Sequence, residues 1–461
     1  MKKFDVIVIG SGGGAKITSP AAKLGFKVAV IEKDKLGGTC LNRGCIPSKM
    51  LIHPADVAQT INSAKKFDID VDTNISVNFA KLVSRISNTV DGDSNSIAAG
   101  YGKNPNITFF PTEGKFVSDK VIRVGSDEIT ADKIFIATGA RPHIPEIEGL
   151  LGTPFMTSTE ALRNTKLPRK MIVIGGSYIA VEIGHAYGAL GCEVHFFVRS
   201  KLVRREDFQV ADEFQKVFSK LYNVHLGAVP IKVQYHNAMF TVTFKHQDGK
   251  TSQMMADSLL IATGVTPNTD NLGLDNTKIK LSPDGFIKVD DHLRTGVDGV
   301  WALGDCIGNY LFRHSVNFEG EYLMRTIFTE KKNEPINYGP VPHAIFTHPQ
   351  IAGAGKTEDE LKAEGADYVV GLNYYKDSAM GMALLSDHGF VKLLIDRKSR
   401  RILGVHVIGE EASNMVHMVI ALMYKDGTLD DLLKMIYIHP ALPEIVRNAA
   451  RNAKIALDGS L

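Results

Sequence analysis

The chain repeats one pattern: a hydrophobic strand, a glycine-rich turn, a helix and a second strand. The first copy runs from FDVIVIG at Phe4 to KVAVIE at Glu32. The second runs from KMIVIG at Lys170, through a helix ending near Leu190, to a strand over Glu193–Val198. Such a unit holds a dinucleotide because the turn backbone and the helix N-terminus face its pyrophosphate. Two units therefore predict an α/β protein that binds two dinucleotides and transfers electrons between them.

The first turn, Gly10–Ala15, fits the spacing G-x-G-x-x-A. Gly10 allows the tight turn, Gly12 lets the backbone approach a phosphate, and the small Ala15 permits close packing of helix on strand. Glu32 closes the second strand, where a carboxylate binds the hydroxyl pair of an adenosine ribose. A glycine-rich turn without a ligand is the alternative, but strand, helix and acid all stand in register.

The second turn departs from this spacing at two positions. It begins with Gly175, but Ser177 replaces the middle glycine and adds a side chain, whose hydroxyl could itself donate to a phosphate. The strand then ends in Arg199, with Arg205 shortly after it, where an acid would select NADH. Cations here accommodate the 2′-phosphate of NADPH, so we expect NADPH, with NADH as the second candidate. A solvated basic loop is the alternative interpretation of VRSKLVRRED.

Composition excludes several classes of protein. With 461 residues the chain is too long for one ordinary domain. Its 53 basic and 51 acidic residues give a net charge of +2, which does not indicate a nucleic-acid partner. No apolar run approaches the roughly 20 residues of a membrane span, and Asp5 interrupts the apolar start. We therefore expect a cytoplasmic protein without a membrane or nucleic-acid partner.

Two of the four cysteines, Cys40 and Cys45, lie in GGTCLNRGCIPSK (Gly37–Lys49). Their spacing alone is compatible with a structural disulfide, half of a metal site or a redox pair. A zinc site needs two further soft ligands, whereas Cys192 and Cys306 stand alone and are expected to be buried thiols. An inert disulfide is unusual in a reducing cytosol. We therefore expect a redox pair and no metal.

At this point the chain resembles the class I pyridine nucleotide-disulfide oxidoreductases, the flavoprotein family of glutathione reductase, dihydrolipoyl dehydrogenase, mycothione reductase and mercuric reductase. The resemblance covers essentially the whole chain, and the redox motif is similar almost residue for residue. Four further motifs follow in the family's order: FIATGARP (Phe135–Pro142), LIATGVTP (Leu260–Pro267), VWALGD (Val300–Asp305) and HPALPE (His439–Glu444).

The resemblance implies two Rossmann-like domains and a C-terminal α+β domain. An FAD domain spans 1–150, a NAD(P) domain is inserted at 151–264, the FAD domain continues over 265–335, and an interface domain at 340–461 forms a homodimer. The polar stretch Lys331–Val341 fits the last boundary. In the interface domain we expect two strands and two helices, over Gly389–Ile395, Arg401–Ile408, Thr428–Met435 and Pro443–Ala456.

The resemblance also implies the chemistry. NADPH reduces FAD, the flavin reduces the Cys40–Cys45 disulfide, and the dithiol reduces a small-molecule disulfide by thiol exchange. Cys45 lies against the flavin and Cys40 attacks the substrate. Exchange needs a proton carrier that works near neutral pH. His439, oriented by Glu444, fills this role in the other subunit's active site.

Further site residues follow from the resemblance. Lys49 lies near flavin N5 and pairs with Glu182, and Tyr178 lies over the flavin and swings aside for the nicotinamide. Without the motifs, a helix-face ion pair and a core aromatic would explain these residues. The residues expected at FAD are Gly10, Gly12, Ala15, Glu32, Thr39, Lys49, Thr138, Gly139, Gly304 and Asp305. Those expected at NADPH are Gly175, Ser177, Tyr178, Glu182, Arg199, Arg205 and Gly264.

Three features separate the branches of the family. Arg199 argues against dihydrolipoyl dehydrogenase, which carries an acid at this position. The stretches HPALPEIVRNAA and ALGDCIGNYLFRHSVNFEGE resemble mycothione reductase. The C-terminus, ALDGSL, lacks the cysteine pair of mercuric reductase and the large thioredoxin reductases. We therefore expect an NADPH-dependent reductase of a mycothione- or glutathione-like disulfide. Dihydrolipoyl dehydrogenase is the alternative. A non-catalytic redox-sensing flavoprotein is a third interpretation, against which the cysteine pair, His439 and Glu444 argue.

Overall fold

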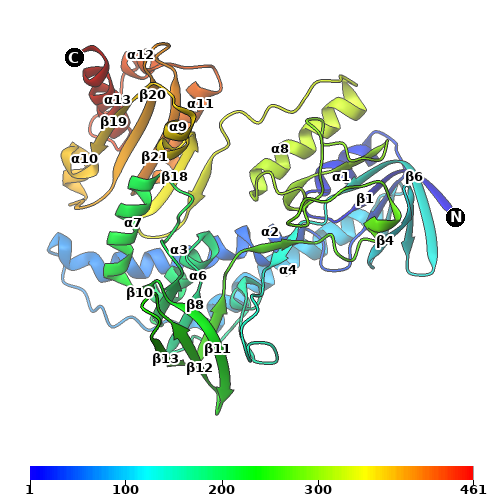
Figure 1. Ribbon diagram of the computed structural model, residues 1–461, viewed down its shortest axis with the longest axis horizontal. Helices are drawn as coiled ribbons and strands as arrows, with labels where there is room; N and C mark the ends of the chain where they lie inside the picture. The colour runs from blue at the N-terminus through cyan, green and yellow to red at the C-terminus, as the bar shows by residue number, and fades with distance from the viewer. Residues whose placement is uncertain (460–461) are drawn as a thin grey trace.

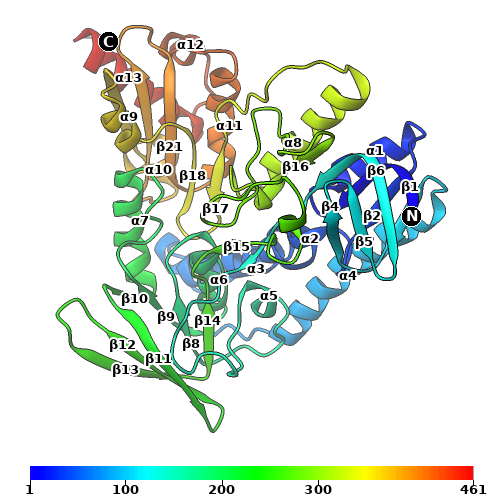
Figure 2. The ribbon, with the colours of Figure 1, turned by 45° about the vertical axis from the view of Figure 1, so that its right-hand side comes forward.

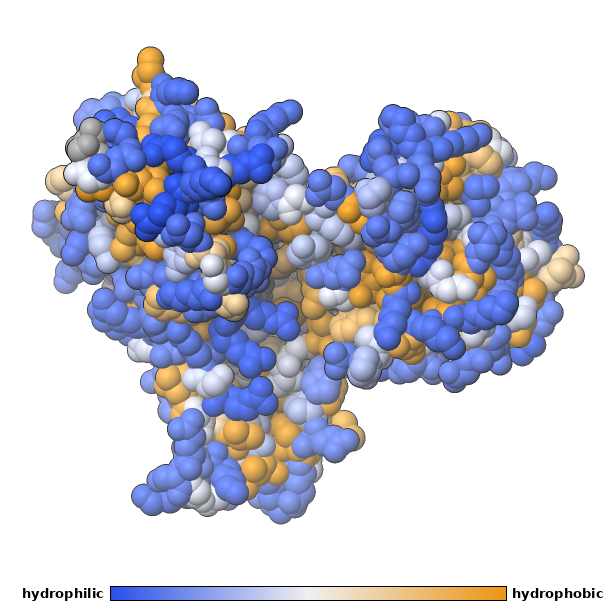
Figure 3. Space-filling view, turned by 45° about the horizontal axis from the view of Figure 1, so that its top comes forward, coloured by the Kyte–Doolittle hydropathy of each residue, from blue (hydrophilic) through white to orange (hydrophobic). Residues whose placement is uncertain are grey.

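The chain folds into three lobes, each built on its own β-sheets (Figure 1, Figure 2). The computed structural model describes residues 1–459, so residues 460–461 of the expected interface domain lie outside it. Within the described residues, no helix has the length and apolar character needed to cross a membrane. A space-filling view shows a hollow between the first and third lobes, with hydrophobic residues on its floor (Figure 3).

The first lobe contains a seven-stranded sheet with the order β3-β2-β1-β6-β5-β4, in which β16 also pairs with β6. The inner strands are buried on both faces, which explains their continuous runs of Val and Ile. The strands are β1 (Lys2–Ile9), β2 (Val28–Ile31), β3 (Ile107–Phe110), β4 (Gly114–Ser118), β5 (Val121–Val124), β6 (Asp127–Ile136) and β16 (Val300–Ala302). Its helices are α1 (Ala15–Lys23), α2 (Gly38–Arg43), α4 (Phe79–Lys103) and α8 (Arg313–Leu323).

The second lobe contains a parallel sheet, β10-β9-β8-β14, and an antiparallel sheet, β11-β12-β13. The strand predicted at Glu193–Val198 is confirmed as β9, and the predicted helix as α6. The parallel strands are β8 (Lys170–Ile174), β9 (Glu193–Val198), β10 (Asn223–Leu226) and β14 (Ser258–Ile261). The other elements are β11 (Val229–His236), β12 (Met239–Lys245), β13 (Thr251–Ala256), α6 (Tyr178–Ala189) and α7 (Phe208–Leu221).

The third lobe is an antiparallel sheet, β17-β18-β21-β20-β19, covered by helices. The two strands and two helices predicted here are confirmed to within two residues at each end. The strands are β17 (His343–Ile345), β18 (Gln350–Gly355), β19 (Tyr368–Tyr374), β20 (Phe390–Asp396) and β21 (Ile402–Gly409). The helices are α9 (Glu358–Glu364), α11 (Ala412–Met423), α12 (Leu429–Lys434) and α13 (Pro443–Asp458).

The first and second lobes are joined by the two linker motifs and by helix α3. The two linker motifs lie side by side, because β7 (Ala140–Pro142) pairs antiparallel with β15 (Val265–Pro267). After the second lobe the chain returns to the first sheet, where β16 pairs with β6. Helix α3 (Cys45–Ser63) begins in the redox motif, and its apolar residues join the core of the second lobe. The boundaries expected at residues 150, 264 and 335 stay predictions.

A buried ionic cluster joins the second lobe to the third. Lys392 on β20 is fully buried, and its Nζ lies 2.8 and 2.9 Å from the two carboxylate oxygens of Asp207. The same Nζ lies 2.5 Å from Glu358 Oε2. Asp207 also caps α7 by accepting a hydrogen bond from the backbone N–H of Gln209. Because breaking a buried pair costs about 3–5 kcal/mol, this cluster fixes the start of α7.

Candidate active site

The redox cysteines lie where two helices meet beside the first glycine turn. Cys40 lies within α2 and Cys45 is the first residue of α3, with Gly44 between the two helices. Both are free thiols in this structure. Gly38 has a φ of +67°, and a Cβ on it would lie 2.5 Å from the Gly12 Cα. Glycine is therefore required for the redox segment to reach the turn backbone.

The two thiols influence each other's ionisation. Interaction with the Cys45 thiol lowers the pKa of Cys40 to about 7; burial opposes this shift, while Arg313 and Lys49 favour the thiolate. The pKa of Cys45 is raised because its thiol interacts with the Cys40 sulfur and would ionise beside it. The pair therefore shares one proton and holds one thiolate at neutral pH, as a nucleophile requires.

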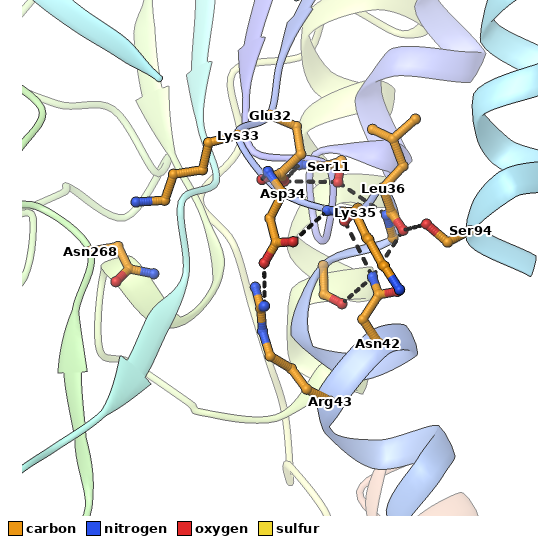
Figure 4. Close-up of polar contacts among 12 residues, drawn as sticks. Ser11, Glu32, Lys33, Asp34, Lys35, Leu36, Asn42, Arg43, Ser94 and Asn268 are labelled. Atoms are coloured by element: carbon orange, nitrogen blue, oxygen red, sulfur yellow. Dashed lines mark hydrogen bonds and ion pairs between the residues drawn. The ribbon is translucent and has the colours of Figure 1, made fainter. Parts of the chain in front are cut away.

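Side chains around the motif hold its loop in place (Figure 4). Glu32 Oε2 accepts hydrogen bonds from the backbone N–H and the hydroxyl of Ser11, at 3.0 and 2.9 Å. Asn42 Nδ2 donates to the Leu36 carbonyl at 2.9 Å and to the Gly38 carbonyl at 3.1 Å. Sequence reasoning named Glu32 but missed Ser11 and Asn42. The only available signal for Asn42 was its place between the two cysteines.

The expected pair of Lys49 and Glu182 is present and joins all three lobes. Lys49 Nζ lies 2.7 Å from Glu182 Oε2, on α6 of the second lobe. The other oxygen, Oε1, accepts from the backbone N–H of Phe346, just after β17 of the third lobe. The ammonium group also lies 4.5 Å from the centre of the Phe346 ring. A helix-face pair within one element is thus excluded.

The expected FAD residues gather at the carboxyl edge of the first sheet. They follow four of its strands: Gly10 after β1, Glu32 after β2, Thr138 and Gly139 after β6, and Gly304 and Asp305 after β16. Ala15 starts α1, and Thr39 lies exposed on α2. This edge is where open α/β sheets bind dinucleotides.

The donors and acceptors at this edge fit FAD. Thr138 Oγ1 is buried and has no hydrogen-bond partner within residues 1–459. Burial raises the pKa of Asp305 to about 6, with Arg313 opposing, and its carboxylate accepts no hydrogen bond from the described residues. Gly10 has a φ of +100°, and a Cβ on it would lie 2.2 Å from the Ala137 carbonyl oxygen. The turn thus requires glycine at its first position, and the Thr138 hydroxyl and the Asp305 carboxylate beside it are available to a ligand.

The second turn repeats this geometry. A Cβ on Gly175 would lie 2.2 Å from the Ala262 carbonyl oxygen. Ser177 caps α6 but makes no capping hydrogen bond with its side chain. Gly264, after β14, has a φ of +124°. These three residues lie at one edge of the second sheet.

The basic loop after β9 divides into paired and unpaired cations. Arg199 and Arg205 are exposed and make no hydrogen bond or ion pair with any residue of the described range. Lys201 lies 2.6 Å from Asp212 and is therefore already paired. Arg204 is exposed and, like the two arginines named above, has no described partner.

Tyr178 is held by two residues that sequence reasoning did not identify. Its hydroxyl donates to Glu206, and the other carboxylate oxygen of Glu206 lies 2.7 Å from His343 Nε2. Burial and the neighbouring Glu206 raise the pKa of Tyr178. Because Glu206 and His343 are distant in sequence, no local pattern indicated this contact.

His439 lies in the loop between α12 and α13, in the third lobe. Its Nδ1 lies 3.0 Å from Glu444 Oε2, as expected, while Glu444 also accepts from the backbone N–H of Ala441 and from Arg447. The His439 side chain is 70% exposed, and its hydrogen bonds within residues 1–459 go to Glu444 alone. The structure therefore does not bring His439 to the cysteines of its own chain.

Comparison with known proteins gives the family of this arrangement. A family model described as "Pyridine nucleotide-disulphide oxidoreductase" matches residues 4–326, and the dimerisation domain of the same family matches residues 341–450. The chain belongs to the pyridine nucleotide-disulphide oxidoreductases. It is an FAD-dependent enzyme that uses a pyridine nucleotide, and it carries the family's dimerisation domain.

Similar proteins come from more than one branch of this family. A mycothione reductase from Mycobacterium tuberculosis is 34% identical over 97% of this chain and 99% of its own length. A dihydrolipoyl dehydrogenase from Cupriavidus necator is also 34% identical, over 97% of this chain and 98% of its own. A solved structure, a Cu(II) complex of the HOCl-induced flavoprotein disulfide reductase RclA from Escherichia coli, matches with a TM-score of 0.87 and 27% identity. It covers 98% of this chain and 99% of that one.

Proposed function

We propose that the protein reduces a small-molecule disulfide of the mycothione or glutathione type, with electrons from NADPH passing through FAD to Cys40 and Cys45. The observation that carries this proposal is the thiol pair, because it lies against the first glycine turn and holds one thiolate near neutral pH. The choice of NADPH is supported by the unpaired, exposed Arg199 and Arg205. The unpaired buried thiols Cys192 and Cys306 support a reducing compartment, the cytoplasm.

The residues of the chain account for the disulfide exchange. The Cys40 thiolate attacks one sulfur of the substrate and forms a mixed disulfide, and the departing thiolate takes a proton from His439 of the partner subunit. The Cys45 thiol then loses its proton, and its sulfur attacks the Cys40 sulfur. The second substrate sulfur departs as a thiolate and takes up this proton, which releases the second thiol and restores the Cys40–Cys45 disulfide. Glu444 orients the imidazole and stabilises its protonated form. When bound, FAD supplies the two-electron transfer from the nicotinamide that regenerates the dithiol.

A homodimer is part of this proposal because His439 lies in the third lobe without a contact to the cysteines of its own chain. Two large apolar side chains in the preceding loop are exposed: Ile436 fully and Ile438 at 80%. Exposed apolar residues of this kind mark an interaction surface. We infer that this loop enters the partner subunit and brings His439 to the partner's thiol pair.

Spectroscopy and turnover test the proposal together. Anaerobic addition of NADPH to the FAD-loaded protein should produce a long-wavelength absorbance band between a thiolate and the flavin. Cys45→Ser should abolish this band, because the family resemblance places Cys45 against the flavin. Cys40→Ser should keep it, because it removes the sulfur that raises the pKa of Cys45. Turnover should then be measured with both nicotinamides against oxidised mycothiol, oxidised glutathione, other small disulfides and lipoamide. A folded, FAD-loaded protein without the band would contradict the catalytic role.

Dihydrolipoyl dehydrogenase is the second candidate function. It is supported by the Cupriavidus necator relative, which is as similar to this chain as the mycothione reductase. The candidates differ in the direction of electron flow and in the coenzyme. Rapid reduction of NAD⁺ by dihydrolipoamide, with slow turnover of all other disulfides, would select the second candidate.

A further inference from the structure

The Tyr178 ring lies between two lobes. Tyr178 is the first residue of α6, directly after the second glycine turn. Its ring stacks on Phe312, the residue before α8 of the first lobe, with centroids 6.0 Å apart and an interplanar angle of 26°. A coenzyme bound along the second turn must pass its nicotinamide through this space to reach the first lobe. The ring therefore blocks the route of the nicotinamide.

Glu206 fixes the ring in this position. The Glu206 side chain is 1% exposed, and its two oxygens have separate partners, the Tyr178 hydroxyl and His343 Nε2. Burial would raise the pKa of Glu206, but His343 and Tyr178 stabilise the charged form, and the pKa lies below its ordinary value. A buried carboxylate forms strong hydrogen bonds, so the ring leaves this position only by breaking one.

The backbone at Glu206 cannot follow the ring. The next residue, Asp207, is anchored to the fully buried Lys392 of the third lobe. The preceding residue, Arg205, is exposed to solvent. Three consecutive charged residues thus have three different environments: solvent, Tyr178 and the third lobe. Movement of the ring therefore separates its hydroxyl from Glu206.

We propose that Glu206, supported by His343, is a positioning residue that latches Tyr178 across the nicotinamide route. A coenzyme must then break the Tyr178–Glu206 bond to bind. The proposal rests on the proposed function, in which a nicotinamide coenzyme reduces FAD, and on the expectation from the family resemblance that Tyr178 moves aside for the nicotinamide. Because the latched form does not accept the nicotinamide, the apparent Kd equals the intrinsic Kd divided by the fraction of protein in the unlatched form. Adenosine fragments that lack nicotinamide do not pay this penalty.

Calorimetric binding to the FAD-loaded, oxidised full-length protein tests the latch. The ligands are NADP⁺ and 2′,5′-ADP, or NAD⁺ and ADP-ribose if turnover selects NADH. Glu206→Gln weakens a charge-assisted bond and Tyr178→Phe removes it, so each should lower the Kd of the whole coenzyme by roughly 5–10-fold. The Kd of the fragment should stay within about twofold. The double variant should bind the coenzyme no more tightly than Tyr178→Phe alone, since both changes act on the same hydrogen bond.

Two further variants separate a latch from a general packing effect. Tyr187→Phe removes another buried hydroxyl from α6, one that donates to the Ala161 carbonyl at 2.6 Å, and should leave the ratio of the two Kd values unchanged. His343→Leu should resemble Glu206→Gln, because a carboxylate without this partner takes up a proton and accepts more weakly. His343→Gln keeps a donor and should restore the wild-type ratio.

The outcomes distinguish this proposal from the proposed function. If Tyr178→Phe changes the ratio but Glu206→Gln does not, the latch is wrong and the role of Tyr178 stands. If neither variant changes it, both the latch and the movement of Tyr178 are wrong. If the wild-type protein binds neither coenzyme, the proposed function itself is wrong, and the latch is wrong with it.

Discussion

The first nucleotide unit ends its second strand with Glu32, and the second unit ends the equivalent strand with Arg199. Up to that point the two are alike, since a Cβ on Gly10 or on Gly175 would lie 2.2 Å from a backbone carbonyl oxygen. The carboxylate of Glu32 is tied to Ser11 by two hydrogen bonds, whereas Arg199 has no partner in the described chain. The backbone thus requires glycine at the first position of each turn. The residue that follows the strand is not required by the backbone and can differ according to the ligand.

The cysteines beside the two units differ even more. Cys40, beside the first turn, has a pKa lowered to about 7 by its interaction with Cys45. Cys192, one residue before β9 of the second unit, is buried, and desolvation raises its pKa to about 12. Position beside a nucleotide unit does not by itself make a thiol reactive. The partner thiol and nearby cations do so in the first unit.

Alkylation of the reduced protein gives the largest expected difference between the units. The thiolate is the reactive form and accumulates as pH rises through the pKa, so labelling of Cys40 should increase across pH 6–8 and then level off. At neutral pH the thiolate fraction of Cys192 should be smaller by on the order of 10⁴–10⁵. Iodoacetamide labelling with peptide mass spectrometry measures both. Both should label in denaturant, and rapid native labelling of Cys192 would contradict the difference.

Gly10→Ala and Gly175→Ala test the part that the units share. Each adds a clash with backbone to a left-handed φ, which together cost about 2–6 kcal/mol. Gly10→Ala should lose FAD, whereas Gly175→Ala should keep FAD and lose reduction by the coenzyme. Flavin content and thermal unfolding measure this outcome. Gly125→Ala is the control, because Gly125 has a φ of +61° with open space around it, and only the strain applies. Equal loss of FAD in both variants would contradict separate sites.

The sequence predicted contacts whose residues sit in recognisable motifs, and it missed those that depend on how the lobes pack. Lys49 and Glu182 were paired correctly because each lies in a motif of the family. Glu206 and His343 lie on different lobes and in no motif, so their contact follows from tertiary packing alone. Lys392 is the one charged residue among the buried residues of β20, and nothing near it in sequence indicated Asp207 as its partner.

The active site shows the same division between local motifs and contacts that depend on packing. The cysteine pair could be predicted because both thiols lie in one short motif. The interaction between the thiols that lowers the pKa of Cys40 could not be predicted, because it depends on the relative orientation of α2 and α3. The pairing of His439 with Glu444 was local and is present, but the distance of His439 from the cysteines depends on the third lobe.

Arg199→Glu combined with Arg205→Ala should remove the preference for NADPH, because it gives the second unit an acid where the first unit has Glu32. Each charge-assisted contact with the 2′-phosphate is worth about 1.5–3 kcal/mol, so the NADPH KM should rise roughly 10–100-fold per contact. The NADH KM should change far less. Steady-state kinetics with both nicotinamides measures the switch. Arg204→Ala is the matched control, since Arg204 is equally exposed and unpaired but is not assigned to the phosphate. An unchanged coenzyme preference would contradict the assignment of Arg199 and Arg205 to the 2′-phosphate.

Ser177 gives the smallest expected effect and tests the remaining difference between the turns. Ser177 stands where the first turn has Gly12, and its hydroxyl makes no capping bond to α6, so it is available to donate to a phosphate. Ser177→Ala should therefore raise the coenzyme Kd by roughly 2–10-fold, the value of one hydrogen bond, while Ser177→Thr keeps the donor. Calorimetry measures these changes.

Ser177→Gly tests whether the Ser177 side chain contacts the phosphate or obstructs it. The stability of the helix cap changes by only a few tenths of a kcal/mol in this variant, so the change in Kd reports on the phosphate. Tighter binding by Ser177→Gly would mean that the side chain obstructs the phosphate, and weaker binding that its hydroxyl replaces the contact that glycine gives in the first turn.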